Sequence, residues 1–140
     1  MTQLILILHF LAMAVGVGGS VASMITGITA GGLPPEARPS VGLVQRRIGI
    51  AAAIALALLW ITGIWLLFLL YGGISGLFLL FDLKILAAAV LTGISIRMQL
   101  LSIRGRKTGI PPPPATTRKL GIAGLITSLT VVVLAVLSFN

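Results

Sequence analysis

Three ionisable side chains, His9, Asp82 and Lys84, fall inside long apolar segments of this chain. His9 follows the start of its segment at Leu4, and Asp82 and Lys84 follow the start of theirs at Leu77. Along a helix these separations correspond to roughly 7–11 Å. Ionisable residues are costly inside a membrane, and those found there generally bind ligands, carry ions or pair with one another. We therefore take these three residues as candidates for function.

The side chains near His9 suit a planar or redox-active ligand. Met13 follows His9 by one helical turn, so an imidazole and a thioether on one helix face could share a copper(I) ion. His9 could instead be an axial ligand of haem b, with Lys84 pairing with a propionate. Trp60 and Trp65 would pack against the ring of such a ligand. We expect a polar pocket in the outer leaflet that binds haem, a porphyrin or copper in a redox-linked role, with His9 as the metal ligand.

The same residues also have purely structural interpretations. Lys84 could extend its side chain to nearby headgroups, and Asp82 could cap the start of a helix. His9 could hydrogen-bond a neighbouring helix without any ligand. Trp65 is of a residue type that anchors helices at the membrane interface. The sequence leaves these interpretations open, and it does not decide whether the protein is an enzyme.

The composition excludes several other classes of site. The chain has no cysteine and a single histidine, which removes disulfides, iron–sulfur clusters and zinc sites built from one chain. Its two carboxylates are Asp82 and Glu36, and Glu36 lies in a proline-rich stretch, so a hydrolase with paired carboxylates is excluded. Neither a GxSxG motif nor a Walker A motif is present.

Four apolar segments must position these side chains. They cover about residues 4–30, 48–70, 77–101 and 120–139, and each is long enough to cross roughly 30 Å of hydrocarbon as a helix. Of the 140 residues, 58% are hydrophobic and 9% are charged, which is too apolar for a water-soluble domain of this size. The sequence predicts one all-α transmembrane domain, residues 1–140, folded as a four-helix bundle with up-down topology.

The basic residues predict the orientation of this bundle. All the Lys and Arg residues except Lys84 fall in or beside the first and third connections, predicted at residues 31–47 and 102–119. By the positive-inside rule these basic loops are cytoplasmic, and both termini are extracytoplasmic, in the cell (inner) membrane. The loops would contact anionic headgroups of the lipid bilayer. Because the bases interrupt apolar runs rather than cover a polar face, we expect no nucleic-acid partner. The run Pro111–Pro114 predicts a stiff, extended segment in the third connection.

Small residues at four-residue spacing predict close helix packing. Small residues let helix backbones approach closely in lipid. They favour a tight bundle and would also serve a homodimer or a larger membrane complex. The series are Ala12-Gly16-Ser20, Gly19-Ser23-Gly27, Gly49-Ala53-Ala57, Ala89–Gly93 and Gly124–Ser128.

Four short motifs resemble those of the HemJ-like and copper-resistance-D-like small membrane proteins, in order and at similar spacing. They are Leu8-His9-Phe10-Leu11-Ala12 with Gly18-Gly19, Gln45-Arg46-Arg47-Ile48, Trp60-Ile61-Thr62-Gly63-Ile64-Trp65-Leu66-Leu67, and Leu83-Lys84-Ile85-Leu86. The resemblance implies a four-helix membrane protein with a haem-linked or copper-linked role, in which His9 and Lys84 match the family's histidine and lysine. The HemJ-like branch oxidises protoporphyrinogen. It carries a further histidine on the third span, which residues 92–98 lack here.

Two alternative functions remain open. A non-catalytic accessory or assembly subunit of a larger membrane complex would account for the scarcity of functional side chains. A small dimeric transporter would need a buried acid for proton coupling, and Asp82 is the candidate.

Overall fold

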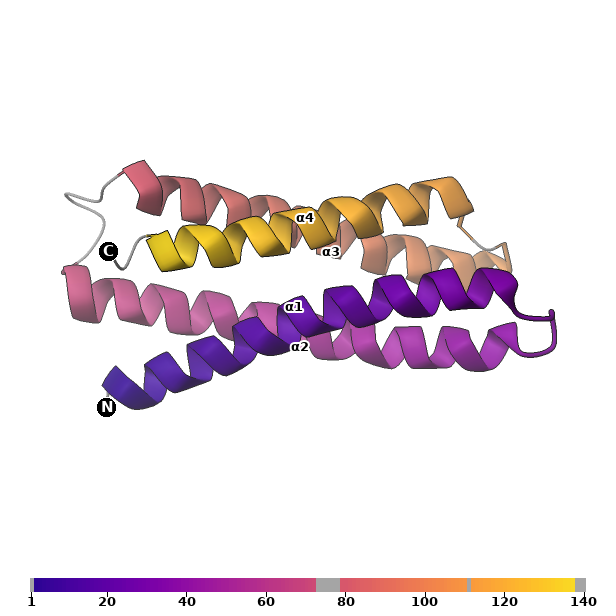
Figure 1. The fold of residues 1–140 in the computed structure, drawn as a ribbon, viewed down its shortest axis with the longest axis horizontal. Helices are drawn as coiled ribbons and strands as arrows, with labels where there is room; N and C mark the ends of the chain where they lie inside the picture. Colours follow the sequence, from indigo (N-terminus) through magenta and orange to yellow (C-terminus); the bar gives the residue numbers. More distant parts are fainter. Residues whose placement is uncertain (1, 73–78, 111, 138–140) are drawn as a thin grey trace.

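The chain folds into four long helices. The computed structural model describes residues 2–72, 79–110 and 112–137, and no strand occurs within them. The helices are α1 (Thr2–Gly32), α2 (Arg38–Tyr71), α3 (Leu79–Thr108) and α4 (Pro114–Leu137) (Figure 1). All four are long and apolar enough to cross a membrane, as the sequence predicts. The protein is therefore a multi-pass membrane protein.

The helices extend beyond the spans predicted from hydropathy. Helix α2 begins at Arg38, α3 continues to Thr108 and α4 begins at Pro114, so all ten Lys and Arg residues lie on helices rather than in loops. The two connections shorten to residues 33–37 and 109–113. Arginine and lysine are good helix formers, so nothing requires a helix to end where the hydrocarbon ends.

Proline and glycine fix the helix boundaries. Pro39 lies in the first turn of α2, where a missing N–H costs nothing. Gly72 ends α2 in the left-handed region, with a φ of 67°, and Gly109 does the same after α3, with a φ of 69°. The predicted extended proline run is shorter than expected. Pro114 is already the first residue of α4, and the carbonyl of Pro113 accepts the first hydrogen bonds of that helix. Pro111 lies outside the described residues, as do Leu77 and Phe139 at the edges of two predicted spans.

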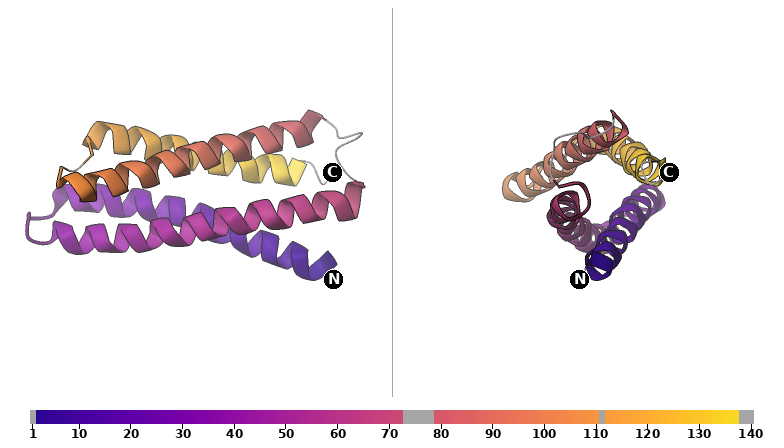
Figure 2. Two further views of the ribbon diagram at one scale, coloured as in Figure 1. Left: turned by 180° about the vertical axis from the view of Figure 1, so that it is seen from behind. Right: turned by 90° about the vertical axis from the view of Figure 1, so that its left-hand side faces the viewer.

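The four helices form two hairpins that pack against each other. Helix α1 packs along α2 and also touches α4, and α3 packs along α4. Helices α2 and α3 meet at only a few points, so the bundle is more open on that side. Figures 1 and 2 show successive helices running in opposite directions.

The predicted close packing is seen at part of the small-residue series: Gly19, Gly27, Gly49 and Gly124 lie against a neighbouring helix, whereas a Cβ added at Gly16 or Gly93 meets nothing within 4 Å. A Cβ added at Gly19 would lie 3.4 Å from the Ala52 side chain on α2, and one at Gly124 would lie 3.5 Å from Ile94 on α3. Most large apolar side chains are exposed instead. The buried residues include alanines as well as Met13 and three leucines, and the apolar exterior is the arrangement expected in lipid.

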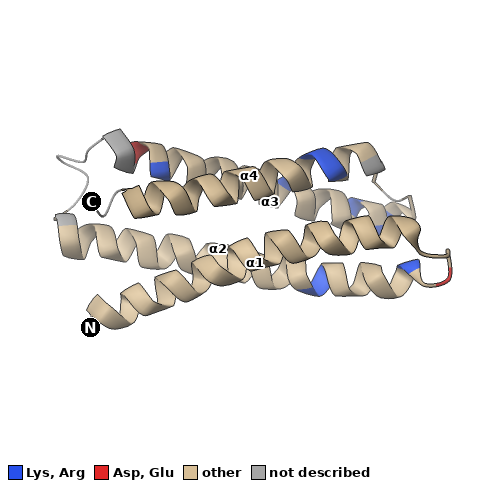
Figure 3. Cartoon of the chain, in the orientation of Figure 1, with Lys and Arg blue, Asp and Glu red and all other residues tan. Residues whose placement is uncertain are grey.

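Charge is distributed unevenly along the bundle. Most Lys and Arg residues lie toward the end that holds the connections 33–37 and 109–113, which we call the basic end (Figure 3). Asp82, in the first turn of α3, and Lys84 lie toward the opposite end. A carboxylate near a helix N-terminus is favourable, because the backbone dipoles leave partial positive charge there.

Candidate functional site

His9 is held by a hydrogen bond that joins α1 to α2. Its Nδ1 atom lies 2.8 Å from Oγ1 of Thr62. Thr62 is buried, with 6% of its surface exposed, and its Oγ1 lies 2.6 Å from the carbonyl oxygen of Leu58. The imidazole is half-buried. Interhelical hydrogen bonds of this kind stabilise membrane bundles and fix the rotation of one helix against another.

The direction of these hydrogen bonds determines the tautomer of His9. A carbonyl oxygen only accepts, so the single hydroxyl proton of Thr62 lies between Oγ1 and the Leu58 carbonyl. Thr62 Oγ1 therefore accepts from His9, and Nδ1 carries the ring proton. Nε2 is left with its lone pair. This is the state in which a histidine ligates a metal, with its other nitrogen oriented by a second residue.

The His9 ring packs against α2 at Gly63. A Cβ added at Gly63 would lie 3.5 Å from Cε1 of His9, so the imidazole lies against the α2 backbone. Phe10 meets the ring edge-on, with the ring centroids 6.5 Å apart. Thr62 and Gly63 belong to the motif at residues 60–67, but their contacts with His9 were not predicted from the sequence. The available signal was a Thr-Gly pair inside a long apolar segment.

Lys84 lies near this histidine, on α3. It is half-buried, and it is close enough for its ammonium charge to act on the imidazole of His9. Asp82, two residues earlier, is exposed. The structure thus joins His9 to Thr62 by a hydrogen bond, and Lys84 lies near the start of α3, at the same end of the bundle.

The two tryptophans occupy different environments. Trp60 points toward α3, where its Nε1 donates to Oγ1 of Thr92 at 2.9 Å. Thr92 in turn donates to the Ala88 carbonyl of its own helix at 2.7 Å. Trp65 is 56% exposed on the bundle surface. Trp60 therefore links α2 to α3, and Trp65 has the exposure of an interface anchor.

Met13 lies one turn along α1 from His9. It is 8% exposed and lines a small cavity between the helices. In the parts of the chain that the structure describes, no group of three or more His, Asp or Glu side chains could hold a metal ion together. A donor set of one imidazole fits a metal that brings its own ligands, as the iron of haem does, better than a bare copper ion.

Two further polar contacts join helices nearer the basic end. Gln45 on α2 donates from Nε2 to the Ser23 carbonyl on α1 at 3.3 Å. Gln99 on α3 donates from Nε2 to the Gly49 carbonyl on α2 at 3.1 Å. Neither of these two hydrogen bonds was predicted from the sequence, although an uncharged polar side chain in an apolar span is itself a signal of an interhelical hydrogen bond.

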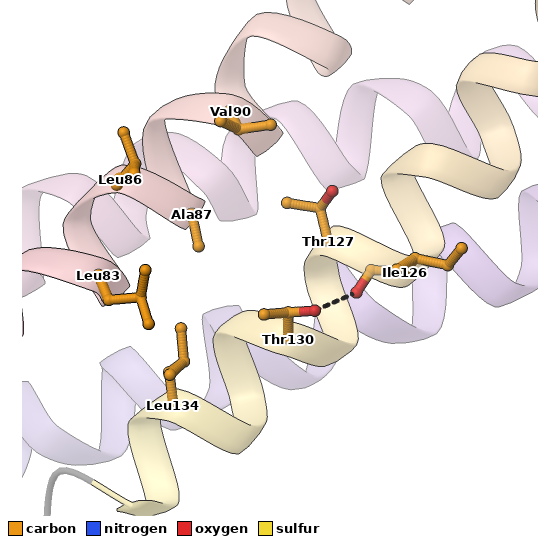
Figure 4. A pocket seen from close by; sticks show the side chains of 8 residues that line it. All are labelled: Leu83, Leu86, Ala87, Val90, Ile126, Thr127, Thr130 and Leu134. Carbon is orange, nitrogen blue, oxygen red and sulfur yellow. Dashed lines mark hydrogen bonds between the residues drawn. The ribbon is translucent and has the colours of Figure 1, made fainter. Parts of the chain in front are cut away.

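Cavities also lie elsewhere in the bundle. A groove of about 290 Å³ runs between α3 and α4, and it is lined by Leu83, Leu86, Ala87, Val90 and residues of α4 (Figure 4). The hydroxyl of Thr130 donates to the Ile126 carbonyl of its own helix, so it offers the groove no free proton. A second cavity of about 50 Å³ lies between all four helices. Neither His9 nor Lys84 lines either of them.

No family model, no curated protein and no solved structure matches this chain.

Proposed function

We propose that this membrane protein binds haem or a related porphyrin through Nε2 of His9. The observation that carries the proposal is the chain of two hydrogen bonds from His9 to Thr62 to the Leu58 carbonyl, which leaves Nε2 as a bare, oriented ligand. The resemblance to the HemJ-like and copper-resistance-D-like proteins supports the same choice of residue.

Each residue of the site has a separate part in this proposal. His9 would ligate the iron, and Thr62 holds the imidazole ring in one orientation and one tautomer. The Lys84 ammonium pairs with a carboxylate of the porphyrin, which lowers the cost of keeping that charge near hydrocarbon. Haem iron exchanges single electrons, so the role we assign to the site is electron handling.

The orientation of the chain follows from its charges. The basic end lies in the cytoplasm, because positively charged segments are retained on that side of the cell (inner) membrane. His9 and Lys84 then lie in the outer leaflet, and both termini are extracytoplasmic. The basic residues contact anionic headgroups at the cytoplasmic surface.

An absorption spectrum of the purified protein tests this function. We expect detergent-solubilised protein that has been mixed with hemin and then separated from unbound hemin to keep a Soret band, and we expect that band to shift on reduction. His9 is the single histidine of the chain, so His9→Ala should abolish the band. Gln99→Leu removes a different interhelical hydrogen bond and should leave the band unchanged.

Two outcomes would contradict the proposal. One is wild-type protein without a Soret band, and the other is a His9→Ala variant that keeps it. Copurification with a larger membrane complex and no bound cofactor would then favour the accessory-subunit alternative.

A further inference from the structure

The cavity between the four helices, which we call the central cavity, is lined by hydroxyl groups from three of them. Ser20 comes from α1, Ser95 from α3 and Ser128 from α4. The remaining lining is apolar and includes Met13. Ser128 is buried, with 3% of its surface exposed. Serines from three helices thus line one cavity of a bundle whose interior is otherwise mostly apolar.

Two of these hydroxyls present only acceptor sites to the cavity. The Ser20 hydroxyl donates to the Gly16 carbonyl at 3.0 Å, and the Ser128 hydroxyl donates to the Leu125 carbonyl at 2.8 Å. Each donates its one proton to its own helix and keeps oxygen lone pairs. Ser95 has a hydroxyl that can donate or accept. The ligand that complements these three hydroxyls is a small neutral molecule that donates two hydrogen bonds, to Ser20 and Ser128, and accepts one, from Ser95.

The volume of the central cavity and its uncharged lining favour the same kind of ligand. The central cavity has a volume of about 50 Å³, and a water molecule takes up about 30 Å³ in the liquid. No charged side chain lines the cavity. A cation there would lack a counter-charge in a low-dielectric interior, which is costly.

We propose that the central cavity is a water site, in which one or two water molecules bridge the hydroxyls of Ser20, Ser95 and Ser128. The bridge links α3 to α1, two helices that do not pack against each other directly. Ser20 lies roughly 16 Å along α1 from His9, at 1.5 Å per residue. Met13 lies one turn from His9, so the cavity extends from near the level of His9 toward the middle of the membrane.

Met13 provides a built-in reporter for this water. Brief X-ray radiolysis converts bound water to hydroxyl radicals, which oxidise the nearest reactive side chain, and the Met13 thioether lines the cavity. We expect Met13 in the apo protein to be oxidised rapidly, in spite of its burial, as measured by mass spectrometry.

Two glycines of α1 give a matched pair of variants. A Cβ added at Gly16 or at Gly18 meets nothing within 4 Å, so neither Gly16→Ala nor Gly18→Ala creates a clash, and both gain helix propensity. Gly16 lines the cavity, whereas Gly18 is exposed. Gly16→Ala should lower the rate of Met13 oxidation several-fold, and Gly18→Ala should leave it unchanged.

Slow oxidation of Met13 in the wild-type protein would overturn the proposal, and so would equal rates in the two variants. Thermal unfolding gives a second measurement. If the cavity is dry, Gly16→Ala fills a void and stabilises the protein more than Gly18→Ala does. If it holds water, the added methyl displaces a bridging molecule and the gain is smaller than that of Gly18→Ala. Neither readout involves haem, so the outcome is independent of the proposed function.

Discussion

Replacing Thr62 by valine separates the structural and the ligating roles of His9. Valine keeps the branched shape of this buried side chain and removes the oxygen that accepts from His9 Nδ1. The Leu58 carbonyl keeps its bond in the α2 backbone, so one interhelical hydrogen bond is lost. Such bonds are worth about 0.6 kcal/mol on average in membrane bundles and about 1.7 kcal/mol at most. We expect a loss of stability within that range.

The effect of Thr62→Val on haem affinity should be larger. Without Thr62 the ring is free to rotate and to move its proton to Nε2, which removes the ligand lone pair. Loss of a residue that orients a ligating histidine weakens metal binding about 10–100-fold, which corresponds to about 1.4–2.8 kcal/mol. The assays are unfolding in detergent for the free energy of unfolding, and hemin titration followed at the Soret band for the dissociation constant.

Thr92→Val is the matched control. Thr92 also donates to its own helix and accepts a hydrogen bond across an interface, but its donor is Trp60. It should lose comparable stability and keep the haem affinity of the wild type. Haem affinity in Thr62→Val equal to that of the wild type would refute the argument about the tautomer. An equal loss of affinity in both variants would show that the effect is a general loosening of the bundle.

Three further predictions concern packing and orientation. Trp60→Phe should lower the free energy of unfolding by about 0.6 kcal/mol for the lost hydrogen bond, plus a packing term for the smaller ring, and only the hydrogen-bond part should vanish in a Thr92→Val background, because both changes remove that bond. Gly19→Leu should cost about 1–3 kcal/mol in the same measurement, because its side chain would collide with α2. Gly31→Leu, where an added Cβ meets nothing within 4 Å, should be tolerated, and equal costs at the two sites would contradict the packing argument. In this cysteine-free chain, Glu36→Cys should react with an impermeant maleimide in inside-out vesicles and not in right-side-out ones, and the opposite pattern would reverse the orientation.

The sequence by itself determined the helices. In hydrocarbon a helix satisfies every backbone hydrogen bond, so four long apolar segments leave one architecture open. The prolines and glycines between those segments mark where the helices end, and some of the small residues, such as Gly19 and Gly124, mark where two helices come into contact. The sequence also shows that the basic residues are placed unevenly along the chain, and the proposed orientation is based on that placement.

Only the tertiary structure decided which way each helix faces. The helices are apolar all round, and lipid and bundle interior are alike in polarity, so the hydrophobic pattern does not distinguish an inward from an outward position. That is why the sequence assigned both Trp60 and Trp65 to packing against a ligand ring, although one bonds to Thr92 and the other is exposed. It is also why the pairing of His9 with Thr62 could not be foreseen. Contacts between residues of different helices depend on rotation and register, and in this chain a few small residues and single polar bonds set both.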